Sequence, residues 1–209
     1  MTVLRSRILN SVAAACAAMA VLGASRADAQ PAPGSVEVGP NFSVLRLSEF
    51  DTTDVGIGVD AAWHVLPRIS LDGSLILFPG GGEEPSLSDQ RRTLGLIGVR
   101  SGITRGRVDL YARGRIGFLN FGESGPFACT LIYPAPLACQ LAGGYTAFAT
   151  DIGGGAIMPI DADGRWRIRV DVGDLIVRYG LDGIRNNGRV TDGFSSHNLL
   201  LTAGMVFGF

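Results

Sequence analysis

The chain has 209 residues with 18 basic and 19 acidic side chains, and its net charge of −1 argues against a nucleic-acid or other polyanionic partner. Every basic residue is arginine, and no stretch after the first thirty residues is long and apolar enough for a membrane-spanning helix. The 30 glycines are spread through patterned segments instead of one linker, which argues against a flexible or low-complexity chain.

The first segment, residues 1–29, is predicted to be an export signal. Arg5 and Arg7 supply its positive start, and an apolar run follows over residues 8–23. The small-residue sequence Ala27-Asp28-Ala29 is a suitable cleavage site. The protein is therefore expected to leave the cytoplasm.

Two other interpretations of this segment stay open. A membrane anchor is less consistent with a short run that is rich in alanine. Cleavage before Cys16, followed by lipidation, would leave a very short signal, and the preceding alanines match a lipoprotein pattern only loosely. Under the main interpretation, residues 30–209 form one domain.

The mature chain contains eight segments in which apolar and polar residues alternate with the period of two that indicates β-strands. They cover residues 35–46, 54–65, 68–78, 92–103, 106–119, 145–158, 165–178 and 197–209. Short links at 66–67, 105 and 161–164 take turns with longer ones at 47–53, 79–91, 120–144 and 179–196. This order predicts an all-β fold, an eight-stranded antiparallel up-and-down β-barrel of the kind that spans an outer membrane.

The two faces of each segment differ in polarity. In the seventh, for example, Trp166 and Ile168 oppose Arg167 and Arg169. A soluble barrel such as a lipocalin points its apolar face inward, whereas a membrane barrel points it toward lipid. Eight strands enclose a lumen only wide enough for side chains. We therefore expect the bulky apolar residues outside, and the small and charged residues inside.

The charged face predicts a lumen filled by paired ions. An isolated buried charge costs several kcal/mol, so acids and arginines are expected to pair and to close the bore, as a structural network rather than as a transport or catalytic site. The predicted network comprises Glu37, Asp60, Asp72, Arg100, Asp109, Arg113, Arg115, Asp151, Arg167, Arg169 and Asp171.

Aromatic residues are expected where the barrel wall meets the lipid headgroups. Trp63, Trp166, Phe207 and Phe209 are predicted to form a periplasmic girdle, and Phe118 and Tyr179 are predicted to face outward at the opposite interface. The outward set of the last strand is Leu201, Ala203, Met205, Phe207 and Phe209.

Taken together, the signal, the eight alternating segments and three short motifs resemble the small outer-membrane β-barrel family of the OmpA/OmpX type. The motifs are Gly-Val-Arg-Ser-Gly at 98–102, Arg-Val-Asp-Val at 169–172 and Met-Val-Phe-Gly-Phe at 205–209. The resemblance implies Gram-negative export, escort by periplasmic chaperones and insertion into the outer membrane by the barrel-assembly machinery, which reads the last strand. Neither a cofactor nor the peptidoglycan-binding domain of some members is implied.

Two residues depart from the ideal pattern. Asp174 would face lipid if its strand were regular, so a bulge at Gly173-Asp174 that turns Leu175 and Val177 outward is predicted. Pro40 has no N–H for strand pairing, and a bulge is expected there as well.

Two other functions are weighed against a non-enzymatic barrel. A lipid A-modifying enzyme needs a nucleophile and a base, and Ser195-Ser196-His197 is the suggestive cluster. Neighbouring strand residues point to opposite faces, so Ser195 could reach His197 and Ser196 could not. A soluble periplasmic carrier is the other alternative. No catalytic or metal-binding residues are assigned.

Cys129 and Cys139 lie in the longest link between segments. In an oxidising compartment, two cysteines in one exposed loop predict a disulfide. Closing a loop of this size would stabilise the protein by about 3 kcal/mol in the entropic model. The bridged loop is the candidate contact surface for an unknown partner.

Overall fold

The structure is a computed structural model that describes residues 33–80, 91–123, 144–161, 163–180, 184–186 and 189–209. The predicted export signal, Cys16, Cys129 and Cys139 lie outside these ranges. In the described part of the chain, no helix is long and apolar enough to cross a membrane.

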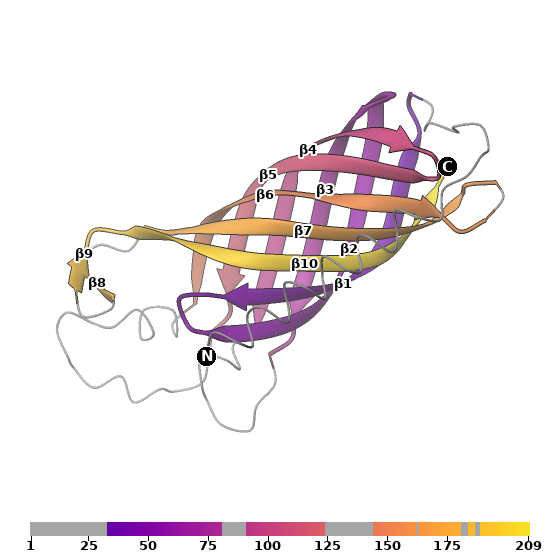
Figure 1. Ribbon diagram of the computed structural model, residues 1–209. Helices are drawn as coiled ribbons and strands as arrows, with labels where there is room; N and C mark the ends of the chain where they lie inside the picture. Colours follow the sequence, from indigo (N-terminus) through magenta and orange to yellow (C-terminus); the bar gives the residue numbers. More distant parts are fainter. Residues whose placement is uncertain (1–32, 81–90, 124–143, 162, 181–183, 187–188) are drawn as a thin grey trace, which may run out of the picture.

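The described residues form a closed antiparallel barrel of eight strands, as the alternating pattern predicted (Figure 1). The barrel strands are β1 (Val36–Leu47), β2 (Thr52–Leu66), β3 (Ile69–Phe78), β4 (Arg92–Arg105), β5 (Val108–Phe121), β6 (Tyr145–Pro159), β7 (Trp166–Tyr179) and β10 (Phe194–Gly208). Each strand pairs with its neighbours along the chain, and β1 closes the ring against β10. A separate two-stranded sheet, β8 (Ile184–Asn186) and β9 (Arg189–Thr191), lies between β7 and β10 in the chain.

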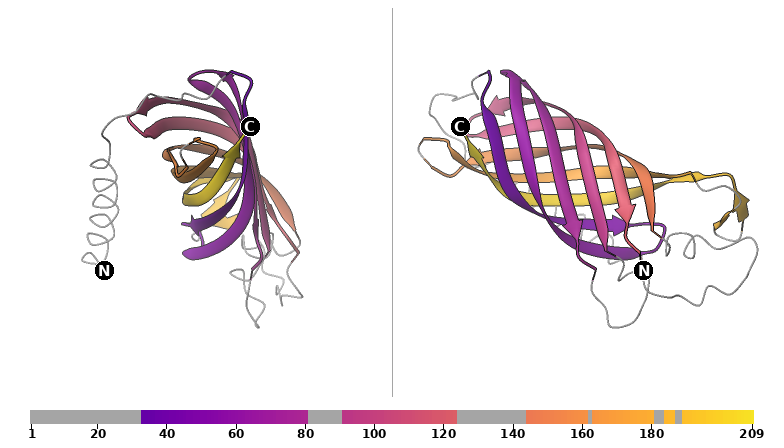
Figure 2. Two further views of the ribbon diagram at one scale, coloured as in Figure 1. Left: turned by 90° about the vertical axis from the view of Figure 1, so that its right-hand side faces the viewer. Right: turned by 180° about the vertical axis from the view of Figure 1, so that it is seen from behind.

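The two ends of the barrel differ in their connections. At the end that holds the C-terminus, called here the turn end, short links join β2 to β3, β4 to β5 and β6 to β7. The other end, called here the loop end, carries the connections from β1 to β2, from β3 to β4 and from β5 to β6, and the β8–β9 sheet. Figure 2 shows that the strands run obliquely around the barrel between these two ends. The predicted sorting of short and long links holds except between β1 and β2, where the link is residues 48–51 instead of the longer 47–53 that was predicted.

Several strands extend further toward the loop end than the sequence indicated. β5 continues to Phe121, β7 continues to Tyr179, and β10 already begins at Phe194. Pairing between these strand ends continues, with Phe121 opposite Tyr145 and Phe194 opposite Tyr179. The extensions are only one to three residues long, and both faces of β10 there carry a serine, so alternation does not mark where the strands end.

The predicted bulges at Pro40 and at Gly173-Asp174 are wrong. Pro40 pairs with Val59 in an unbroken β1–β2 register and is exposed on the outer wall. Gly173 pairs with Leu200 and Asp174 with Leu199, again without a shift. A regular strand keeps Asp174 outside and turns Leu175 and Val177 into the lumen, where both are fully buried. The register shift that does occur lies between His64 and Leu66, beside the β2–β3 turn.

The outer wall is apolar along most of its height. Ile57 and Leu75 are 64% and 52% exposed, whereas Asp60, on the opposite face of β2, is 2% exposed. This arrangement inverts a soluble barrel, in which the large aliphatic residues would be enclosed and the charges would meet water. The predicted orientation of the two faces holds for these strands.

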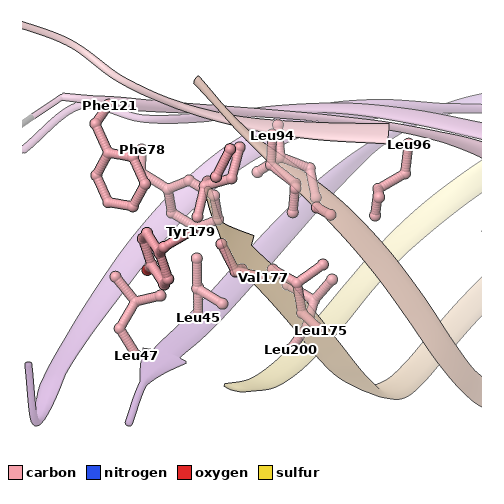
Figure 3. Packing of buried hydrophobic residues seen from close by; sticks show 14 residues of the cluster. Leu45, Leu47, Phe78, Leu94, Leu96, Phe121, Leu175, Val177, Tyr179 and Leu200 are labelled. Atoms are coloured by element: carbon pink, nitrogen blue, oxygen red, sulfur yellow. The ribbon is translucent and has the colours of Figure 1, made fainter. Parts of the chain in front are cut away.

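The loop half of the lumen is hydrophobic, which the sequence interpretation missed. Its buried side chains, called here the apolar layer, pack against one another across the bore (Figure 3). They are Leu45, Leu47, Ile76, Phe78, Leu94, Leu96, Leu119, Phe121, Ala147, Ala149, Leu175, Val177, Tyr179 and Leu200. The expectation that Tyr179 faces outward is wrong, since its ring packs inside against Phe121 and Phe194 with centroids 6.1 and 4.9 Å apart. Large aliphatic residues thus fill part of the lumen as well as the lipid-facing wall.

Candidate functional site

The turn half of the lumen is polar, and its buried side chains are called here the polar layer. It comprises Glu37, Asp60, His64, Ser70, Asp72, Arg100, Tyr111, Arg113, Arg115, Asp151, Arg167, Arg169 and Asp171. The division follows each strand. On β7, Arg167, Arg169 and Asp171 come first from the turn end, and Leu175 and Val177 follow toward the loop end.

The centre of the polar layer is a set of ion pairs, some between neighbouring strands and some across the lumen. The Asp151 carboxylate accepts hydrogen bonds from Arg113 Nε at 2.9 Å and from Arg115 Nε at 3.0 Å. Asp72 accepts from Arg169 Nη1 at 3.0 Å, and Arg115 Nη1 lies 3.5 Å from it. Each of these two carboxylates is therefore shared by two guanidinium groups.

Asp171 joins the same network from β7. It accepts from Arg169 Nε at 2.8 Å, lies 2.6 Å from Arg113 Nη1, and receives the Tyr111 hydroxyl. Tyr111 in turn accepts from Arg169 Nε at 2.9 Å. The planar fork of arginine suits this sharing, because its donors can reach two acids at once.

Toward the turn end, a second group forms around Glu37. Its carboxylate lies 2.7 Å from Arg100 Nη2 and 2.5 Å from Arg167 Nη1. His64 Nε2 is 2.9 Å from Glu37 Oε1, and His64 Nδ1 is 2.8 Å from Ser70 Oγ. This group lies on the rim of a recess that opens at the turn end.

Charge is balanced across the polar layer. Its acids are Glu37, Asp60, Asp72, Asp151 and Asp171, and its guanidinium groups are Arg100, Arg113, Arg115, Arg167 and Arg169. Burying charges without partners would cost several kcal/mol each, so near neutrality is a condition for enclosing so many. The arrangement fills the bore with hydrogen-bonded side chains.

Two predicted members of the network have other surroundings. Asp60 is buried in the polar layer, but its carboxylate belongs to none of the ion pairs formed by the described residues. Asp109 is only half-buried at the turn end, where it accepts a hydrogen bond of 2.5 Å from the Thr104 hydroxyl.

The sequence interpretation missed two buried polar contacts. Arg92 and Asp54 form an ion pair at the loop end of β4 and β2. The contact between His64 and Ser70 joins neighbouring strands at the turn end. Counting in steps of two from Arg100 and from Asp60 places Arg92, Asp54 and His64 on the inner face, so their orientation could be predicted. Which residues they contact could not be predicted, because the partners are distant in sequence.

The cluster Ser195-Ser196-His197 is divided between the two faces of β10. Ser196 points into the lumen and accepts from Asn198 Nδ2 at 3.0 Å, whereas Ser195 and His197 are exposed on the outer wall. His197 Nδ1 lies 2.7 Å from Asp174 Oδ2 on β7. The outward charge of Asp174 thus has a partner, which is why no bulge is needed to remove it from the wall.

The aromatic residues at the turn end lie together on the outside. The rings of Trp166 and Phe207 meet edge to face at 5.0 Å, and Phe207 and Phe209 are 6.0 Å apart. Trp63 is also exposed near the turn end of β2, and Phe118 is exposed on β5. The remaining outward residues of the last strand, Leu201, Ala203 and Met205, alternate with inward Thr202 and Val206.

Comparison with known proteins supports the fold. No protein-family model and no curated protein matches the chain. The N-terminal β-barrel domain of Pseudomonas aeruginosa OprF is similar in structure, with a TM-score of 0.50 at 12% identity over 85% of this chain and 98% of that one. Neisserial surface protein A is similar with a TM-score of 0.52 at 10% identity over 84% of this chain and 96% of that one. The chain thus has the fold of the small eight-stranded outer-membrane β-barrels that its sequence resembles.

Proposed function

We propose that the protein is an integral outer-membrane barrel with a closed lumen, whose role is structural or is carried by contacts at its loop end. The observation that carries this proposal is the inversion of polarity. Residues such as Ile57 and Leu75 cover the outside, while the charges of the polar layer are paired inside. Only a lipid environment favours that distribution.

The lumen supports a closed barrel rather than a diffusion pore. The apolar layer and the polar layer lie one after the other along the bore, and each is built from buried side chains. Eight strands leave no further width for a water-filled channel. We expect no stepwise ion conductance from the folded protein in planar bilayers.

The orientation proposed for the membrane places the turn end in the periplasm and the loop end outside the cell. The segments at 81–90 and 124–143, which join barrel strands at the loop end, are then the candidate surface for an unidentified ligand. Membrane lipid, periplasmic chaperones and the barrel-assembly machinery are the proposed partners, the last through the outward residues of β10.

Cell fractionation followed by gel electrophoresis tests this proposal. The protein should be found in the outer-membrane fraction, and an unboiled sample should migrate differently from a boiled one because folded barrels resist SDS. Protein that stays in solution without detergent after export would instead support a soluble carrier.

A lipid-modifying enzyme is the second candidate, and the pair formed by His197 and Asp174 favours it. A carboxylate oriented on an imidazole is part of a hydrolytic site, and Ser195 lies on the same outer face. Lipid A from cells that express the protein would show a changed acyl pattern, and His197→Ala would abolish the change. An unchanged pattern in the expressing cells rejects this candidate.

A further inference from the structure

A serine, a histidine and a glutamate form a continuous relay at the turn end of the lumen. Ser70 on β3, His64 on β2 and Glu37 on β1 are each at least nine-tenths buried. His64 Nδ1 is 2.8 Å from Ser70 Oγ, and His64 Nε2 is 2.9 Å from Glu37 Oε1. These distances place a nucleophile, a base and an orienting acid in hydrogen-bond contact.

The partners of Glu37 decide which imidazole nitrogen carries the proton. Arg100 and Arg167 both contact the Glu37 carboxylate, which keeps it ionised and therefore able only to accept. His64 Nε2 must then donate to Glu37, which leaves Nδ1 as the nitrogen that can accept from the Ser70 hydroxyl. The hydroxyl proton consequently points at the base that would remove it.

Arg100 supplies a cationic donor beside the hydroxyl. It pairs directly with Ser70 across β3 and β4, and only 4% of its surface is exposed. Its Nη2 serves Glu37, whereas Nη1 is buried without a hydrogen-bond partner in the described residues. Because buried donors are nearly always satisfied, Nη1 indicates a place for an oxygen atom of a ligand.

The relay faces an open recess at the turn end, whose enclosed volume is about 40 Å³. Ser70, His64 and Arg100 line it on one side, and Ile103, Leu110 and Ile157 provide apolar surface. A small, open recess with this lining suits only the short acyl end and carbonyl oxygen of a small molecule, the rest of which would extend into solvent.

We propose that this recess is a serine acyl-hydrolase site for small carboxylic esters. Ser70 Oγ attacks the ester carbonyl as His64 Nδ1 takes its proton, and Arg100 Nη1 stabilises the negative oxygen that forms. The ester C–O bond breaks, and the proton from His64 goes to the departing alcohol. Water then attacks the acyl-serine, gives a proton to Ser70 Oγ through His64, and releases the carboxylic acid.

This activity goes beyond the structural role proposed above and does not depend on the loop-end surface. Ser74 provides a matched control, since it also lies on β3 and faces the lumen but accepts from Arg115 Nη1 at 3.0 Å. If Ser70 is only a buried serine, its replacement by alanine should leave labelling and hydrolysis unchanged, as we expect for Ser74. If Ser70 is the nucleophile, the replacement should abolish both.

The test uses the full mature protein folded in detergent, with folding checked by the gel shift before heating. A fluorescent fluorophosphonate should label the wild type and Ser74→Ala at Ser70, as located by mass spectrometry, and should not label Ser70→Ala. Hydrolysis of p-nitrophenyl acetate should fall by about a hundredfold or more in Ser70→Ala and in His64→Gln.

Two results would overturn the proposal. One is a folded wild type without label at Ser70, and the other is ester hydrolysis that Ser70→Ala leaves unchanged. Ser70→Ala removes a single oxygen atom, so it is the variant that decides the question if His64→Gln does not fold.

Discussion

Arg169 Nη1 lies 3.0 Å from Asp72 Oδ1, and these residues stand on β7 and β3, which are opposite each other in the ring of eight strands. The pair is therefore a brace across the full width of the barrel. Arg115 reaches the same carboxylate from β5. Asp72 thus connects three parts of the wall that share no backbone hydrogen bonds.

Replacement of Asp72 with asparagine should strongly destabilise the barrel. It leaves Arg169 and Arg115 short of a buried counter-charge, and breaking a buried pair in this way costs about 3 to 5 kcal/mol. Urea unfolding in lipid vesicles, followed by the fluorescence of Trp63 and Trp166, measures the change. Asp51→Asn is the control, because its pair with Arg46 is largely exposed and is worth at most about 1 kcal/mol. Equal effects of the two variants would contradict the brace.

Of two glycines on neighbouring strands, one should tolerate replacement by alanine and the other should not. A Cβ on Gly98 would lie 2.0 Å from the carbonyl oxygen of Gly114, so β4 and β5 would have to separate. A Cβ on Gly114 would have nothing within 4 Å. We expect Gly98→Ala to cost about 1 to 3 kcal/mol and Gly114→Ala to be nearly neutral in the same unfolding experiment. A neutral Gly98→Ala would mean that the two strands are further apart than described.

Leu175→Ala should lower the free energy of unfolding, because Leu175 packs in the apolar layer. Leu175 is fully buried, and its truncation leaves a cavity that costs about 2 to 5 kcal/mol. Leu75→Ala serves for comparison, because Leu75 faces outward and lipid can fill the space that its side chain leaves, at a cost of about 1 to 2 kcal/mol. The reverse order of the two losses would indicate that Leu175 faces lipid, as the bulge at Gly173-Asp174 required.

The disulfide between Cys129 and Cys139 stays a prediction from the sequence. Protein from an oxidising compartment should resist a thiol reagent after unfolding until a reductant is added. Reduction should lower the free energy of unfolding by about 3 kcal/mol. Cys129→Ser should match the reduced protein in stability, and free thiols in the untreated protein would rule the bridge out.

The barrel wall could be predicted from the sequence because its two faces differ most where charges alternate with aliphatic residues. On β7, Arg167, Arg169 and Asp171 fix the inner face without ambiguity. The same count in steps of two, continued to Leu175 and Val177, gives the correct orientation. The bulge predicted at Gly173-Asp174, which would keep the charge of Asp174 away from lipid, reverses this orientation and is wrong.

The contents of the lumen could be predicted only in part. Leu175, Ile176 and Val177 are all apolar, so polarity alone does not tell which of them faces inward. The regular register of β7 keeps Asp174 outside, and its partner there is His197, a residue on another strand. The relay through His64 likewise depends on strand neighbours and on a register that the sequence does not state. The alternating pattern predicts the strands, but it does not predict which side chains on different strands contact one another.

The stacking of the apolar layer above the ion pairs has a consequence for engineering. Phe78 and Phe121, the last residues of β3 and β5, both belong to the apolar layer. A foreign peptide grafted after either strand would therefore adjoin hydrocarbon, several residues away from the braces that hold the wall together. Such a barrel is suited to carry inserted sequences at its loop end while the ion pairs of the polar layer stay intact.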